Sequence, residues 1–282
     1  MFYNLLYLVP KNWLSRAVGR LVGRRWPFGL HRVIRDAWIR AFKPDVAEAE
    51  YPLEHYETWA AFFTRRLRAG ARPLEAAALV CPVDGTLTQS GILESSAASL
   101  TQIKGVSYGL KDLLAGWDPA PYAGGAWLTV YLAPYNYHRI HAPAQGRVLR
   151  ARHVPGSLWP VNAWSVRNIR ELFVRNDRIL VEMEHEGDGG GRLTVALVGA
   201  TNVGRTTLAF ADLRGNDPAA SAVRDFVPPG HLRLAKGAEL ACFEMGSTIV
   251  LILDARWAAR LRPGLLAETG PETVRLGQAL SA

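Results

Sequence analysis

The sequence predicts an α+β protein in which an N-terminal helical arm precedes a mainly antiparallel, β-rich body of the barrel or sandwich type. Apolar residues recur at helical spacing through residues 1–75. From Val80 onward, short runs rich in β-branched residues alternate with turn residues. The charge changes as well, because residues 1–43 hold nine of the 33 basic residues and one of the 25 acidic residues. We therefore expect two regions, residues 1–75 and residues 76–282.

The composition is that of a globular protein with a sizeable core, since 49% of the 282 residues are hydrophobic and 21% are charged. Cys81 and Cys242 are the two cysteines. They indicate no disulfide framework and suit a reducing compartment. We expect no signal peptide, because the apolar start lacks a preceding basic region. We also expect no transmembrane helix, because no uncharged apolar run reaches about 18 residues.

The arm is expected to contain three helices. The first begins at Asn12, which would be its N-cap, and the others cover residues 31–42 and 53–68. Arg16, Arg20 and Arg24 mark one face of the first helix, opposite an apolar face with Trp13 at its edge. This pattern is typical of an interfacial membrane anchor, to which each basic residue contributes roughly 1 kcal/mol on an anionic leaflet. The alternative is an apolar face that packs on the body. A nucleic-acid partner is disfavoured by the Leu-rich composition.

The body is expected to consist of short strands. The candidate strands are a segment around Leu87 and residues 127–132, 146–154, 179–185, 193–198, 206–211 and 248–254. Residues 109–114 predict a short helix, residues 187–191 a Gly-rich hairpin loop and residues 216–229 a surface loop.

A Gly-Ser-Thr turn at residues 246–248 directly precedes the last of these strands. Gly246 has no Cβ, so its carbonyl carbon is open to attack by the Ser247 hydroxyl. If a base removes the hydroxyl proton, the peptide shifts to an ester. Elimination then breaks the chain, and hydrolysis leaves a pyruvoyl group. The turn alone leaves this chemistry and a plain structural role both open.

Two histidines, His138 and His141, follow the predicted strand at residues 127–132. A neutral imidazole suits proton abstraction from a hydroxyl, although a structural histidine is the alternative. No further metal ligands stand at suitable spacing, so we expect no metal. Asp84, in an Asp-Gly turn, would complete an acid–base–nucleophile set with His141 and Ser247. The absence of a Gly-x-Ser-x-Gly sequence disfavours an α/β-hydrolase.

These motifs resemble those of the phosphatidylserine decarboxylases, a family of pyruvoyl-dependent membrane enzymes. The family's motifs are Pro-Val-Asp-Gly, Tyr-His-Arg-x-His and Gly-Ser-Thr, here at residues 82–85, 137–141 and 246–248. Further similar segments are residues 158–162, 173–178, 198–204 and 236–240. The resemblance covers about residues 50–255. Ala241 and Met245 depart from the family pattern, and such changes can alter the rate of processing.

The resemblance implies a role for each matched residue. His141 would activate Ser247, and Asp84 would orient the imidazole and stabilise its charged form. Self-cleavage between Gly246 and Ser247 would give a β chain, residues 1–246, and an α chain, residues 247–282, which remain associated. Ser247 would become the pyruvoyl cofactor, which decarboxylates phosphatidylserine to phosphatidylethanolamine through a Schiff base. His138 is the candidate proton donor.

The resemblance also implies a peripheral protein on the cytoplasmic face of the inner cell membrane. Its partners would be phosphatidylserine and an anionic membrane surface. Whether the chain also forms a homodimer is left open by the resemblance. From the residues alone, two other interpretations remain. One is a lipid-directed serine hydrolase that uses Asp84, His141 and Ser247 without self-cleavage, and the other is a non-enzymatic membrane-binding module. Scission between Gly246 and Ser247 distinguishes the expected enzyme from both.

Overall fold

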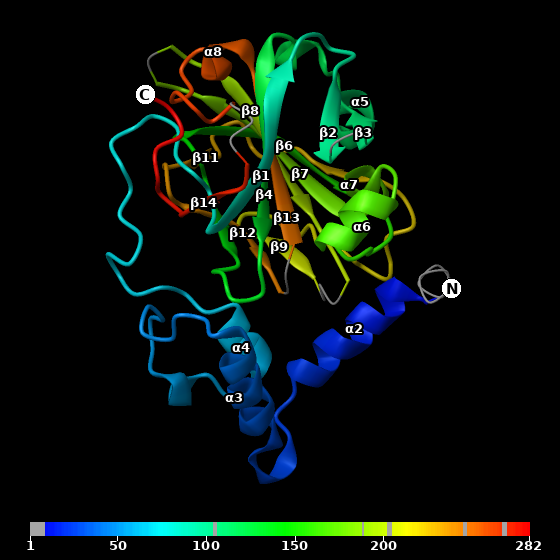
Figure 1. The fold of residues 1–282 in the computed structure, drawn as a ribbon, viewed down its shortest axis with the longest axis vertical. Coiled ribbons are helices and arrows are strands. Elements are labelled where there is room, and N and C mark those ends of the chain that lie inside the picture. Colours follow the sequence, from blue (N-terminus) through cyan, green and yellow to red (C-terminus); the bar gives the residue numbers. More distant parts are fainter. Residues whose placement is uncertain (1–8, 104–105, 188, 202–204, 245–246, 267–269) are drawn as a thin grey trace.

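The computed structural model describes residues 9–103, 106–187, 189–201, 205–244, 247–266 and 270–282. The apolar start at residues 1–8 and the glycine at the expected cleavage site lie outside the described residues. Figure 1 shows a body of strands with the helices of the arm gathered below it. The expected α+β class, with its helical N-terminal arm and antiparallel body, is confirmed.

A nine-stranded sheet forms most of the body. Its main path runs in the order β10-β6-β7-β8-β13-β4-β1-β14, with β11 paired to β6, and every pair is antiparallel. The strands are β1 (Gly85–Leu93), β4 (Gly125–Leu132), β6 (Gly146–Val154), β7 (Arg178–His185), β8 (Arg192–Val198), β10 (Arg224–Phe226), β11 (Arg233–Leu234), β13 (Ser247–Leu253) and β14 (Glu272–Val274). Among the described residues the path does not close, so the barrel alternative is not realised.

Two smaller sheets and several short helices complete the body. One sheet has the order β5-β12-β9 and the other pairs β2 with β3. Their bounds are β2 (Ser99–Ile103), β3 (Val106–Gly109), β5 (Arg139–His141), β9 (Thr206–Leu208) and β12 (Glu239–Phe243). The helices are α5 (Leu110–Leu113), η3 (Ala120–Tyr122), α6 (Ala163–Asn168), α7 (Leu172–Arg175) and α8 (Ala255–Ala258).

Strand β13 lies inside the main sheet, between β4 and β8. Its residues from Ile249 to Leu253 are all buried, which explains why the segment is apolar without a period-2 alternation. The strand begins at Ser247, whose register partner is Leu132 on β4. The start of this buried strand is therefore fixed by pairing on both sides within two residues of Ser247.

The arm consists of α2 (Lys11–Val22), η1 (Pro27–Gly29), α3 (Leu30–Phe42), η2 (Leu53–His55) and α4 (Trp59–Phe63). Trp38 on α3 packs edge-on against Trp59, Phe62 and Phe63. Trp59 and Phe63 belong at the same time to the core of the body. The aromatic cluster thus joins the arm to the body. None of the described helices has the length and apolar character needed to cross a bilayer.

The expected helix over residues 53–68 is wrong. Only the 3₁₀ turn η2 and the five-residue α4 form there, and Thr58 caps α4 by accepting from Ala61 N–H. Beyond α4 the chain runs beside residues 48–50 and pairs with them, through Arg68 N–H to Glu48 O at 2.9 Å. Tertiary pairing here overrides the helical spacing of the apolar residues.

Three smaller expectations are also corrected. Asn12 does not cap α2, which begins at Lys11, because its amide donates instead to Gly156 O at 2.8 Å. Residues 216–229 are not entirely loop, since β10 pairs with β6. The strand predicted over residues 206–211 ends at Leu208.

Two of the arm's basic residues serve the fold rather than its surface. Lys11 is buried, with its ammonium 3.6 Å from the centre of the Trp159 ring. Arg35 is also buried and donates to Leu53 O and Tyr56 O at 2.8 and 3.0 Å. Their charges therefore do not contribute to the exposed basic surface of the arm.

Candidate active site

Backbone hydrogen bonds join the first two sequence motifs and tie the second to the strand that precedes the third. His141 N–H donates to Pro82 O at 2.9 Å, which joins β5 to the turn that carries Asp84. Phe243 N–H donates to His138 O at 2.9 Å, and β5 pairs with β12 along its length. Because β12 leads directly to residues 245–247, both histidines lie on a segment that is tied to the chain just before Ser247.

Strand pairing positions the nucleophile expected from the sequence. Ser247 is the first residue of β13, and its neighbour Thr248 pairs with Tyr131 on β4 and Val198 on β8. Gly246 lies outside the described residues, and for Ser247 the structure describes the backbone position only. The backbone therefore places Ser247 at the start of an internal strand, at the end of the main sheet where β4 and β8 finish.

The His141 ring is held in one tautomer. Its Nδ1 lies 2.7 Å from Gly237 O, which only accepts, so Nδ1 carries the proton and donates. Nε2 is then the free lone pair, and the Tyr137 hydroxyl donates to it at 3.0 Å. Burial lowers the pKa of His141 below its usual 6.5, so the ring is neutral at neutral pH. His141 thus has the state of a general base.

The Gly237 carbonyl depends on a glycine. Gly237 has φ of +79°, in the left-handed region that side-chain-bearing residues rarely adopt. A Cβ at this position would also lie 2.4 Å from the Leu74 side chain. The glycine therefore fixes the turn that orients His141.

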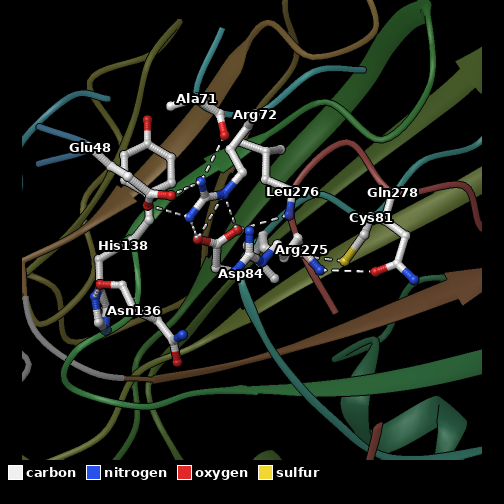
Figure 2. Close-up of polar contacts among 12 residues, drawn as sticks. Glu48, Ala71, Arg72, Cys81, Asp84, Asn136, His138, Arg275, Leu276 and Gln278 are labelled. Carbon is white, nitrogen blue, oxygen red and sulfur yellow. Dashed lines mark hydrogen bonds and ion pairs between the residues drawn. The ribbon is translucent and has the colours of Figure 1, made fainter. Parts of the chain in front are cut away.

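The Asp84 carboxylate is held by a clamp that the sequence did not reveal. Arg72 donates to both of its oxygens, at 2.6 to 3.1 Å, and also binds both oxygens of Glu48 at 2.7 and 2.8 Å. Leu276 N–H donates to Asp84 Oδ1 at 2.9 Å. Figure 2 shows the Arg72 guanidinium between Glu48 and Asp84. Asp84 is thus a buried carboxyl group with three donors.

Asp84 interacts with His141 through its charge but does not form a hydrogen bond with it. The Asp84 charge raises the pKa of His141, but its effect is smaller than those of burial and of the Gly237 hydrogen bond. None of the hydrogen bonds described in the structure joins them, since Gly237 O occupies Nδ1 and Arg72 with Leu276 occupy the carboxylate. In this arrangement Asp84 acts on the imidazole through its charge.

His138 is fully buried beside Phe63, with ring centres 4.2 Å apart. Its Nδ1 donates to Asn136 O at 2.9 Å, whereas Nε2 is among the buried side-chain atoms with no hydrogen-bond partner in the described structure. Burial lowers the pKa of His138 to about 3. The resting ring is therefore neutral, and it can give up a proton to a substrate only after it has taken one up.

An apolar cavity of about 420 Å³ opens at the same end of the sheet. Tyr131 and Pro134 line it and flank Leu132, the strand partner of Ser247. Side chains of the arm form the opposite wall, among them Trp38 and Phe63. The sequence did not predict this cavity, because it forms only where the arm packs on the body.

The described residues contain no group of three or more His, Cys, Asp or Glu side chains arranged to hold a metal. Both cysteines are free and buried.

Comparison with known proteins decides the family. A sequence profile described as phosphatidylserine decarboxylase matches residues 59–282. The chain is 41% identical over 282 residues to a phosphatidylserine decarboxylase proenzyme of Anaeromyxobacter, with 96% of each chain covered. The chain belongs to the phosphatidylserine decarboxylase family. A proenzyme of that name from Halorhodospira halophila is 40% identical over 97% of this chain and 93% of its own.

As a phosphatidylserine decarboxylase, the chain is an enzyme of the carboxy-lyase class, and the family predicted from its motifs is confirmed. A relative from Myxococcus xanthus, 37% identical with 90% of each chain covered, is likewise named as a proenzyme. The comparisons give no support to a serine hydrolase or to a non-enzymatic module.

The Arg72 clamp predicts a large loss of stability in Arg72→Gln. The side chains of Arg72 and Asp84 are 10% and 7% exposed, so the variant leaves a buried carboxylate without its main partner. We expect the free energy of unfolding to fall by about 3–5 kcal/mol, as measured by urea denaturation. The matched control is Arg233→Gln, whose ion pair with Glu186 is far more exposed and should cost about 0–1 kcal/mol. Equal losses would contradict the clamp.

Burial of His138 predicts an acid-dependent loss of stability. The unfolded chain takes up a proton near pH 6.5, whereas the folded chain resists protonation of this ring down to about pH 3. The urea midpoint should therefore fall as the pH drops from about 6.5 toward 3. This part of the decline should be missing in His138→Phe and kept in His231→Phe, where the imidazole is exposed. A His138→Phe profile parallel to that of the parent chain would contradict it.

Proposed function

We propose that this phosphatidylserine decarboxylase processes itself between Gly246 and Ser247 and then acts on phosphatidylserine at a membrane surface. The observation that carries the proposal is the state of His141, a neutral imidazole with its lone pair on Nε2, on a strand tied to the chain that leads to Ser247. A base in this state is what activation of a serine hydroxyl requires.

Each residue has a defined part in the self-processing step. Nε2 of His141 releases the Tyr137 hydroxyl and takes the Ser247 hydroxyl proton, while the negative charge of Asp84 stabilises the imidazolium. The Ser247 oxygen attacks the Gly246 carbonyl, and the peptide bond becomes an ester. Loss of the Ser247 Cα proton breaks the ester, so Gly246 leaves as a carboxylate and residue 247 becomes dehydroalanine. Addition of water then releases ammonia and leaves the pyruvoyl group.

The residues at this end of β13 fit a pyruvoyl group. When formed, this group supplies a carbonyl that draws electrons from the substrate as carbon dioxide leaves. The neutral imidazole of His138, with an unpartnered Nε2 inside the protein, suits proton transfer at such a centre. We assign His138 to carry the proton to the substrate Cα after it has itself been protonated.

The apolar cavity suits the acyl part of the lipid. It opens beside the strand partners of Ser247 and Thr248, so a lipid there has its polar end near residue 247. Phe63 lines the cavity and contacts His138 on the protein side. The same position thus brings the substrate's headgroup toward both the cofactor and the candidate proton donor.

The two chains produced by cleavage are expected to stay together. The smaller one, residues 247–282, includes β13, which pairs with β4 and β8, and β14, which pairs with β1. Its Leu276 N–H also binds Asp84. Separation would break these backbone ladders, so the α and β chains form one folded unit.

We also propose that the arm binds the cytoplasmic face of the inner membrane as a peripheral anchor. Most exposed large apolar side chains of the described residues lie in the arm. Trp13 and Leu21 are 60% and 48% exposed, and Phe28 is fully exposed. Such a patch next to arginines is typical of interfacial helices.

Processing should depend on the two residues assigned to activate Ser247. On a denaturing gel, purified His141→Ala should convert to two chains about 10²–10⁴-fold more slowly than the parent chain, because the general base is lost. Asp84→Asn should also be slowed, and Ser247→Ala should stay intact. His231→Ala is the control and should convert normally. Rapid conversion of both His141→Ala and Asp84→Asn would contradict these roles.

Membrane binding should depend on the exposed apolar side chains of the arm. Replacing Trp13, Leu21 and Phe28 by Ser should weaken binding to phosphatidylglycerol-containing vesicles roughly tenfold or more in a flotation assay, because each buried apolar side chain contributes about 1.5–3 kcal/mol. The control replaces Ile92, Val223 and Val227, which are exposed on the body. An equal loss in the control triple would contradict the anchor.

A further inference from the structure

A polar cavity of about 480 Å³ lies between α2 and the segment from Arg205 to Arg224. This volume is within the usual range of small-ligand sites, about 300–1,000 Å³. Five guanidinium groups line the cavity, those of Arg16, Arg20, Arg205, Arg214 and Arg224. The helix contributes two of them, and the body contributes the other three.

The arm's side of the cavity is held in place. Arg16 and Arg20 are four residues apart, so they lie on the same face of α2. Arg16 donates to Asn216 Oδ1 at 3.0 Å, which joins the helix to the body across the cavity. Arg20 makes no ion pair with any residue that the structure describes.

Three carboxylates also line the cavity, but two of them are already paired. Asp212 binds Arg214, and Asp217 binds Arg224. The third, Glu244, is partly buried, and burial raises its pKa. Five cations against three acids leave an excess of two positive charges, and among the described residues Arg205 acts on the third acid, Glu244, through its charge without a close ion pair.

The cavity is next to both the exposed apolar patch and the site. The same helix, α2, carries the exposed Trp13 and Leu21. On the other side, Arg205 O accepts from Glu244 N–H at 2.9 Å, only three residues before Ser247. An anion in this cavity would therefore lie between the proposed membrane surface and the residues that lead to the cleavage site.

We propose that this cavity binds the phosphate of a glycerophospholipid headgroup. A guanidinium group can donate two parallel hydrogen bonds to two phosphate oxygens, and a bound anion would neutralise the excess positive charge of the five arginines. The lipid's acyl chains would lie along the apolar side chains of α2. This inference rests on the proposal that the arm meets a membrane. The phosphate belongs either to the substrate or to a second, anionic lipid.

The test measures binding of soluble dihexanoyl lipids to the full chain by calorimetry, so that no vesicle is needed. The cavity variant is Arg20→Gln with Arg205→Gln, which removes the two arginines without an ion pair. The control is Arg24→Gln with Arg68→Gln, which makes the same change of charge at exposed positions outside the cavity. We expect the cavity variant to lose roughly tenfold or more in affinity for at least one of two lipids, dihexanoyl phosphatidylserine or dihexanoyl phosphatidylglycerol, and the control less than twofold for both.

Two lipids distinguish the source of the phosphate. Equal losses for dihexanoyl phosphatidylserine and phosphatidylglycerol indicate a site for any glycerophospholipid, whereas a loss confined to phosphatidylserine, with a raised KM, indicates the substrate. Either result supports the site. Equal losses in the cavity and control variants, no loss for either lipid in the cavity variant, or inorganic phosphate binding as tightly as the lipid would each overturn it. Self-processing of both variants on a gel reports the proposed function separately and should be unchanged.

Discussion

The pairing of β13 with both β4 and β8 is the constraint on which the rest of the structure depends. It fixes the backbone at residue 247 at the beginning of an internal strand. Because the same strand is held on both sides, a break before it need not release it. A chain can then carry a reactive N-terminus in its interior without losing its fold.

The titratable groups near the start of β13 have different environments, and these environments give the carboxylate and the two imidazoles different roles. Arg72 pairs with Asp84 inside the protein, while burial keeps His138 and His141 neutral. A fixed negative charge near a neutral imidazole favours its protonation during a reaction without protonating it beforehand. The arm contributes to the same site, since its aromatic cluster closes the apolar cavity beside the strand end.

The sequence predicted correctly those strands and turns that are determined by their own residues. Strand β6 matches residues 146–154 as predicted, and the Gly-rich turn joins β7 to β8 because both signals are contained in the segments themselves. The Arg72 clamp on Asp84 gave no such signal, since it comes from an irregular stretch and is fixed by tertiary contacts. The helix predicted over residues 53–68 was too long for the same reason. Pairing between residues 48–50 and 66–68 limits it to the short α4. The motifs indicated Asp84, His138, His141 and Ser247, but not which donor would occupy each polar atom.

The central claim is that Ser247 becomes the first residue of a separate chain and carries a pyruvoyl group. The most direct measurement is an intact-mass spectrum of the purified protein under denaturing conditions. We expect two chains, the smaller beginning at residue 247 and lighter by one ammonia than a fragment that begins with serine. A single chain of full mass in protein that decarboxylates phosphatidylserine would contradict it.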